Sequence, residues 1–181
     1  MRSLQILLFV CAIHSVYAQN KEGSETANEI KWNKDYKLSY CNFQSAIPEN
    51  TPWAGLTSSK IFFSYETVNG KISAYTVYAS FEPGRSWIKI DTSSVLHHEQ
   101  LHFDITELYA RKLYAEMKSK AGQLTASKSK EIFSGINKEW GKTQEQYDEE
   151  TAHGIVSEAQ EQWVAKIQLL LEQYGPYPES Q

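Results

Sequence analysis

The amino-acid sequence predicts an α+β fold, in which a small antiparallel sheet from the N-terminal half packs against three C-terminal helices. Residues 30–90 contain short runs rich in β-branched and aromatic side chains, separated by turn-forming residues. Residues 93–174 instead carry apolar side chains three and four positions apart, which is the spacing of helices buried on one face. Strands that precede all the helices in the chain are typical of α+β domains.

The N-terminus has the form of a secretory signal peptide. Arg2 precedes an apolar run from Leu4 to Ile13, and a small-residue cleavage site ends at Ala18, so residues 1–18 are predicted to be removed. The apolar run is too short to span a bilayer, and no stable membrane insertion is expected. We therefore expect a secreted or periplasmic protein.

The rest of the chain has the length of one ordinary domain. Residues 19–29 are polar and predict a flexible lead-in, residues 30–175 a single domain, and residues 176–181 a tail. The chain has 18 basic and 22 acidic side chains and no basic stripe, so nucleic acid is not an expected partner. Cys41 is the one cysteine after the signal, and we expect it to be a buried structural residue.

A hairpin within residues 60–81 is the clearest β element. Asn69-Gly70 divides two β-rich runs, and this pair is preferred in type I′ turns because both positions need positive φ. Shorter elements are expected around it: one or two strands within 30–44, a loop over 45–59, and a short strand over 86–90.

Three helices are expected after the strands. The first is predicted from Ser93 to about Lys120, and the second from about Ser129 to Glu150. The third begins at Ser157, where Ser157 and Gln160 have the spacing of a capping box.

The first predicted helix contains an H-E-x-x-H motif, His98-Glu99-Gln100-Leu101-His102. At about 100° per residue, His98 and His102 lie about 40° apart on the face expected to turn inward, so both imidazoles can reach one ion. A zinc ion would satisfy nitrogens that are otherwise costly to bury, and would make a water acidic enough for Glu99 to collect its proton. The motif predicts one catalytic zinc ion with His98 and His102 as ligands and Glu99 as general base. His97 points elsewhere and is expected to be a bystander.

The third zinc ligand is expected from a distant segment. Residues 147–154, YDEETAHG, place several candidates where the second helix ends. His153 is the leading candidate, with Glu150 and Asp148 as open alternatives. Tyr147 is predicted to donate a hydrogen bond to a developing oxyanion, with packing in the core as the alternative.

Three stretches of the chain together resemble a bacterial family of unknown function whose members are predicted secreted zinc-dependent proteases. The stretches are LHHEQLHFDITELYARKL at residues 96–113, YDEETAHG at residues 147–154, and KWNKDYKLSYCNFQ at residues 31–44. The resemblance implies a zincin-like metallopeptidase domain with His98 and His102 as ligands and Glu99 as base. It also supports His153.

These observations predict a secreted zinc-dependent peptidase acting on a protein or peptide substrate. The substrate is expected to add as a strand to a sheet edge within residues 71–90. The alternative is a non-catalytic zinc-binding envelope or interaction protein on the same scaffold, and a third interpretation is a metal-independent protein with incidental histidines. Glu99 favours the peptidase, because a purely structural zinc site does not need a carboxylate at that position.

Overall fold

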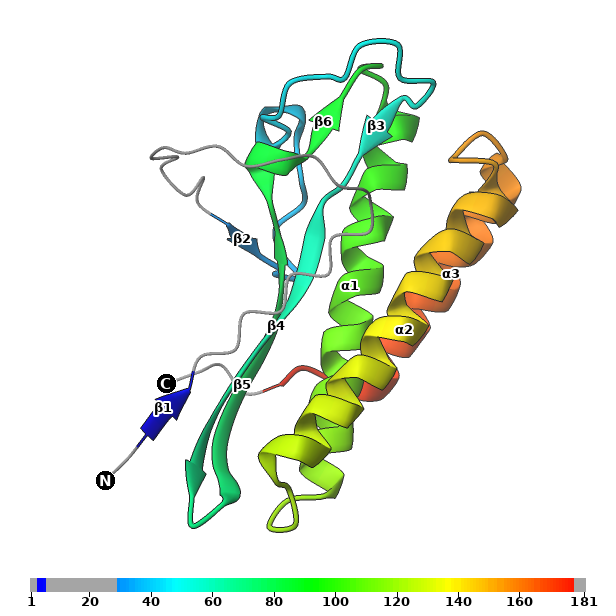
Figure 1. Ribbon diagram of the computed structural model, residues 1–181. Coiled ribbons are helices and arrows are strands. Elements are labelled where there is room, and N and C mark those ends of the chain that lie inside the picture. The colour runs from blue at the N-terminus through cyan, green and yellow to red at the C-terminus, as the bar shows by residue number, and fades with distance from the viewer. Residues whose placement is uncertain (1–2, 6–28, 178–181) are drawn as a thin grey trace.

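The computed structural model describes residues 3–5 and 29–177, and Figure 1 shows a curved sheet on one side of the long helices. The helices are α1 (Ser93–Ser119), α2 (Ala126–Thr151) and α3 (Ser157–Tyr174). One antiparallel sheet has the order β1 (Ser3–Gln5), β4 (Ser59–Val68), β5 (Lys71–Phe81) and β2 (Ile30–Lys31), while β3 (Gly55–Leu56) pairs with β6 (Trp87–Ile88). The predicted α+β fold, with three C-terminal helices, is confirmed.

The β4–β5 hairpin forms the larger part of the sheet, and its turn is the one that the sequence predicts. Val68 pairs with Lys71 across Asn69 and Gly70, which have φ angles of 52° and 76°. Positive φ at both central positions is the signature of a type I′ turn. The face of the hairpin that carries Ile61, Phe63, Tyr65, Val77, Ala79 and Phe81 is buried in the core.

α1 is the central element, because the sheet covers one side of it and α2 and α3 cover the other (Figure 1). Its apolar residues are therefore buried around most of the helix, and these are Leu101, Phe103, Ile105, Leu108, Leu113 and Met117. Thr92 caps the helix, since its Oγ1 accepts a hydrogen bond from the Val95 N–H. The H-E-x-x-H motif thus lies in the first three turns of a helix enclosed from two sides.

Most of the predicted signal peptide and lead-in lies outside the described residues. Residues 3–5 are described, and they form β1, in which Gln5 pairs with Tyr65 of β4. Within the part of the chain that the structure describes, no helix has the length and apolar character needed to cross a bilayer. Tyr177, in the predicted tail, packs against Tyr114 of α1.

Several local predictions differ from the structure. α2 starts at Ala126 instead of about Ser129, because Thr125 caps it by accepting a hydrogen bond from the Lys128 N–H. The predicted loop over 45–59 contains β3, whose pairing with β6 is a tertiary contact. Cys41 was expected to be buried but is exposed, in a short 3-10 turn (Tyr40–Asn42).

The capping box predicted at the start of α3 is also wrong. α3 does begin at Ser157, but its N-cap is Val156, which has no side chain able to cap. Ser157 is consequently the first helical residue, and Gln160 is turned inward instead of back toward the helix start. Ser157 and Gln160 have the spacing of a capping box, but the N-cap position is Val156, one residue before Ser157.

An ionic network is buried where α1, α3 and the C-terminal segment meet. Glu107 and Arg111 are 2% and 8% exposed, and the Arg111 Nε donates to Glu107 Oε1 at 2.8 Å. The Tyr177 hydroxyl donates to the other oxygen of Glu107 at 2.7 Å, and Arg111 donates to the Leu171 carbonyl at 2.7 Å. Each charge therefore has a partner, which a buried ion pair needs to be tolerated.

Replacing Arg111 alone should destabilise the fold strongly. Arg111→Met leaves the Glu107 carboxylate buried without its cation, and we expect a loss of about 3–5 kcal/mol in the free energy of unfolding at pH 7. The double variant Glu107→Leu with Arg111→Met removes both charges and should recover most of this loss. Urea unfolding measures all three proteins.

The pH dependence of the single variant checks the cause of the loss. Burial raises the pKa of Glu107 in spite of Arg111 and Tyr177, and removing Arg111 raises it further. A carboxyl with a raised pKa in the folded state contributes stability at low pH that is lost as pH rises through that pKa. The free energy of unfolding that Arg111→Met loses should therefore become smaller as pH falls toward 5. The control is Arg85→Met, which removes an exposed ion pair and should cost at most about 1 kcal/mol. A pH-independent deficit would contradict this account.

Candidate metal centre

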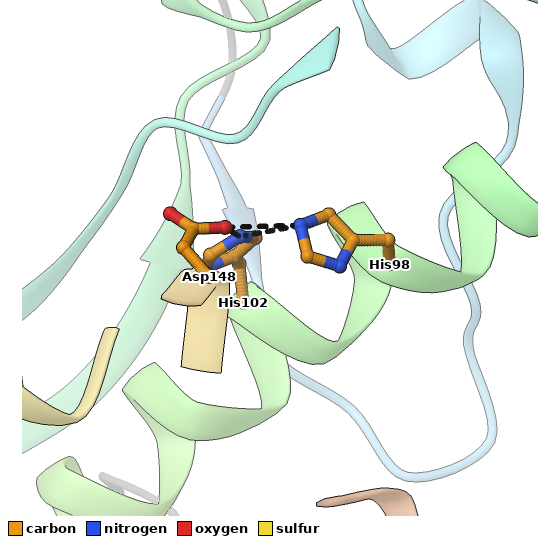
Figure 2. Close-up of side chains that lie close together, drawn as sticks. All are labelled: His98, His102 and Asp148. Atoms are coloured by element: carbon orange, nitrogen blue, oxygen red, sulfur yellow. Dashed lines mark hydrogen bonds and ion pairs between the residues drawn. The ribbon is translucent and has the colours of Figure 1, made fainter. Parts of the chain in front are cut away.

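Three polar side chains from two helices meet in the first half of α1. His98 and His102 project from one face of α1, and Asp148 points toward them from near the end of α2 (Figure 2). Both imidazole Nε2 atoms lie 3.1 Å from the same oxygen, Oδ1 of Asp148, and they are 3.2 Å from each other. Among the described residues, this is the group of histidine, cysteine and acidic side chains compact enough to share one ion.

The spacing of the three donor atoms suits zinc. Tetrahedral zinc with bonds of 2.0–2.1 Å has neighbouring donor atoms roughly 3.3 Å apart. The observed separations of 3.1–3.2 Å are close to that value. Two imidazole nitrogens and one carboxylate oxygen are also a donor set used by catalytic zinc sites, which leave the fourth position to water or substrate.

Two glutamines fix the orientation and tautomer of the histidines. The Oε1 atoms of Gln144 and Gln160 lie 2.7 Å from His102 Nδ1 and 3.2 Å from His98 Nδ1. An amide oxygen only accepts, so each Nδ1 carries the proton and each Nε2 keeps its lone pair. The amide of Gln144 is itself held, since its Nε2 donates to the His102 carbonyl at 3.0 Å. The outer partners therefore direct both lone pairs to the side where Asp148 lies.

The electrostatics of the group favour a positive charge at its centre. Burial acts to raise the pKa of Asp148, but the adjacent imidazoles of His102 and His98 outweigh it and hold that pKa well below its usual range. Burial acts to lower the pKa of His102, but Asp148 and Glu99 outweigh it, so this pKa is raised. A carboxylate that stays ionised next to two imidazoles is suited to binding a cation.

Glu99 is the buried carboxylate beside this group. It is 4% exposed, and its Oε2 has no hydrogen-bond partner in the described part of the chain. Burial raises its pKa, and the nearby His102 and His98 do not reverse the shift. Gly55 of β3 lies directly against it, because a Cβ on Gly55 would come within 2.6 Å of Glu99 Oε1. Glycine at this position lets the strand pass close over the carboxylate.

The chain packs closely around His98 as well. The ring of Tyr147 stacks on the His98 imidazole with centroids 4.6 Å apart. On another side lies Gly154, where a Cβ would be 2.9 Å from His98 Cγ and where φ is +81°. Glycine is therefore required at position 154 for both space and backbone conformation.

The other predicted site residues lie close by, in different roles. His153 has its Nδ1 3.3 Å from Asp148 Oδ1 and is half exposed, so it lies beside the three-atom group and not within it. The Glu150 carboxylate turns away and accepts hydrogen bonds from Gln146 and Trp163. Asp148, the remaining alternative, is the residue that the structure brings to the two histidines.

Tyr147 is fully buried, and its hydroxyl faces the core. The hydroxyl donates to Gln160 Oε1 at 2.6 Å and lies 3.2 Å from the His98 carbonyl oxygen. Burial raises the pKa of Tyr147, which keeps the hydroxyl neutral. The structure thus places Tyr147 in the packing that holds His98, which was the alternative to its predicted oxyanion role.

A cavity of about 470 Å³ opens beside the donor atoms. His98, Glu99 and His102 of α1 form its floor, with residues 53–61 along one side and α2 residues 137–148 along the other. The three donor residues and Glu99 therefore line the same cavity.

The sheet edge beside this cavity is not the one expected within residues 71–90. β5 pairs with β4 along its length and with β2 at Ser80 and Phe81, and none of its residues lines the cavity. The backbone beside the cavity belongs instead to β3 and the start of β4. β3 lies in a segment rich in turn-forming residues, and its pairing with β6 is a tertiary contact that the local sequence does not indicate.

Gln144 and Gln160 are the site residues that the sequence did not reveal. Gln160 was assigned to a helix cap, and Gln144 lies within a run of polar residues on α2 that reads as a solvent-facing surface. Gln144 is four residues before Asp148, so both lie on one face of α2. That spacing was the one available signal, and it becomes useful only when Asp148 is known to face α1.

Removing the partner of His102 should weaken zinc binding without removing a donor atom. Gln144→Leu frees the imidazole to rotate and change tautomer, so zinc affinity should fall about 10- to 100-fold. Competition with a chromogenic chelator measures the affinity. The matched control is Gln146→Leu, an exposed glutamine on the same helix, which should bind zinc like the wild type. Equal affinities for the two variants would remove the proposed role of Gln144.

Comparison with known proteins gives one match. The model of a family described as "Bacterial protein of unknown function (DUF922)" matches residues 78–154, which is less than half of the chain. No curated protein matches the chain, and no solved structure does. The matched segment contains both histidines, Glu99, Gln144 and Asp148, and it stops before α3. The expected similarity to a bacterial family of unknown function is thereby confirmed for the segment that carries the three donor residues.

Proposed function

We propose that the protein is a secreted zinc-dependent peptidase, in which His98, His102 and Asp148 hold one zinc ion and Glu99 is the general base. The observation that carries the proposal is the convergence of three donor atoms 3.1–3.2 Å apart beside a buried carboxylate with an unpartnered oxygen. Export rests on the signal-like form of residues 1–18 and can be read from the N-terminal residue of the mature protein.

In the proposed hydrolysis, the water and the carbonyl group are activated by the zinc ion, and the protein side chains transfer the proton. A bound zinc ion would lower the pKa of a water to about 7 and polarise a carbonyl group. In this proposal Glu99 takes the proton of that water, and the lack of a hydrogen-bond partner for its Oε2 among the described residues supports the role. Its raised pKa brings the carboxyl nearer to neutral pH, where a group can both accept a proton and pass it on to the leaving amine.

The edge of β3 favours an extended peptide as substrate. The Ala54 carbonyl accepts from Lys89 and Ile90, so this edge of the strand is used by β6. The backbone N–H and C=O groups of successive residues point to opposite edges of an antiparallel strand. The Ala54 carbonyl points to β6, so the N–H and C=O of Gly55 point away from β6. Gly55 lines the cavity and lies against Glu99, so an extended peptide that pairs with this edge would lie next to that carboxylate.

Zinc affinity of two variants tests the ligand set. Asp148→Ala removes a donor atom and should lower affinity at least about 100-fold, while His153→Ala should stay within about threefold of the wild type. Chelator competition at pH 7.5 measures both, and thermal unfolding checks that each variant is folded. The reverse order of affinities would make His153 the third ligand.

The role of Glu99 is tested by Glu99→Gln. The variant keeps the shape of the side chain and should bind zinc, but kcat should fall at least about 100-fold because the base is lost. The substrate is a peptide library, with and without chelator. Glu145→Gln changes another acid that lines the cavity and should leave kcat within about threefold.

The outcomes of this experiment separate the candidate functions. Undiminished hydrolysis by Glu99→Gln would refute Glu99 as base. A wild-type protein that binds zinc tightly and cleaves no member of the library would support the non-catalytic zinc-binding function. Absence of zinc binding would refute both.

A further inference from the structure

The two ends of the cavity can be distinguished, because β3 and the start of β4 run alongside α1. Thr57 Oγ1 donates to the Glu99 carbonyl, and Ser59 hydrogen-bonds Thr106 about two turns farther along α1. The chain from residue 55 to residue 59 therefore follows α1 from its start toward its middle. One end of the cavity lies at the first turn of α1, and the other lies near Thr106.

The two ends differ in chemistry. The end near Thr106 is polar and charged, with Lys60 and Arg85 each within 3.5 Å of the Glu82 carboxylate. The end at the first turn of α1 is lined by Trp53 and Val95. Trp53 precedes Gly55 by two residues and Val95 precedes Glu99 by four, so both lie on the same side of the Glu99 carboxylate.

The indole of Trp53 is held at this end although it is 46% exposed. The His153 ring stacks against it with centroids 4.2 Å apart, and His153 in turn contacts Asp148. The indole is thus fixed at the edge of the cavity with much of its apolar surface open to solvent. An apolar group that covers this surface gains the free energy of burial without having to order the indole.

We propose that Trp53 and Val95 form a subsite for a large apolar side chain of the substrate, next to the bond that is cleaved. The inference rests on the proposed peptidase function and adds a specificity to it. Trp53 and Val95 offer only apolar surface at this end, whereas Lys60, Glu82 and Arg85 offer charged partners at the other. The protein therefore selects polypeptides in which an aromatic or large aliphatic residue lies at the Trp53 end.

Binding of short peptides tests the subsite separately from hydrolysis. The probes are blocked pentapeptides with two alanines on either side of a central Phe, Leu, Ala or Asp. Their dissociation constants are measured by calorimetry on zinc-loaded Glu99→Gln, which should not cleave them. We expect the Phe and Leu peptides to bind at least about tenfold more tightly than the Ala peptide, and the Asp peptide most weakly.

Substitution of Trp53 identifies the surface responsible. Trp53→Ala in the Glu99→Gln background should reduce the preference for Phe over Ala to about threefold or less, with zinc affinity unchanged. Leu169→Ala, at a 66% exposed leucine on α3 that is not among the cavity-lining residues, should keep the full preference. Equal affinities for the four peptides, no detectable binding of any, or a preference that survives Trp53→Ala would overturn the proposal. A wild type that fails to cleave peptides while the preference holds would refute the peptidase and leave the subsite standing.

Discussion

The structure depends on the burial of α1 from two sides. A helix enclosed by a sheet and by two other helices cannot turn its polar residues to water, yet His98, Glu99, Gln100, Glu107 and Arg111 of α1 are all at most 8% exposed. Each such group costs free energy unless another segment supplies a partner. The partners come from the Leu38 backbone, from Asp148 of α2, from Gln160 of α3 and from Tyr177, so their hydrogen bonds fix how the surrounding segments are placed on α1.

The two ends of α1 meet this constraint differently. Toward the C-terminal end, the charges of Glu107 and Arg111 neutralise each other. The Tyr177 hydroxyl and the Leu171 carbonyl provide their remaining hydrogen bonds. Toward the N-terminal end, two imidazoles and a carboxylate direct acceptor atoms at one point, and within the described residues their hydrogen-bond partners include no arginine or lysine. A cation is the chemical complement of that arrangement. The contrast separates a region whose charges are neutralised by each other from one whose acceptor atoms would be neutralised by the proposed ion.

The limits of sequence reasoning follow from which contacts are local. The type I′ turn at Asn69-Gly70, the start of α1 at Ser93 and the pairing of His98 with His102 depend on residues a few positions apart, and each was predictable. The identity of Asp148 as the third donor depends on how α2 crosses α1, and the roles of Gln144 and Gln160 depend on the same packing. The sequence favours His153 over Asp148 as the third donor, because it does not indicate which face of α2 turns toward α1.

The connection between α2 and α3 shows how backbone strain serves the site. Ala152 and His153 both have positive φ, 47° and 55°, which for residues other than glycine costs about 1 kcal/mol or more each. The left-handed turn is held by hydrogen bonds from the His153 N–H to the Asp148 carbonyl and from the Val156 N–H to the Thr151 carbonyl. It brings Gly154 against the His98 ring and His153 against the Asp148 carboxylate, and it starts α3 at the residue that lets Gln160 reach His98 Nδ1. One strained turn of three residues thus positions groups around two of the three donor side chains.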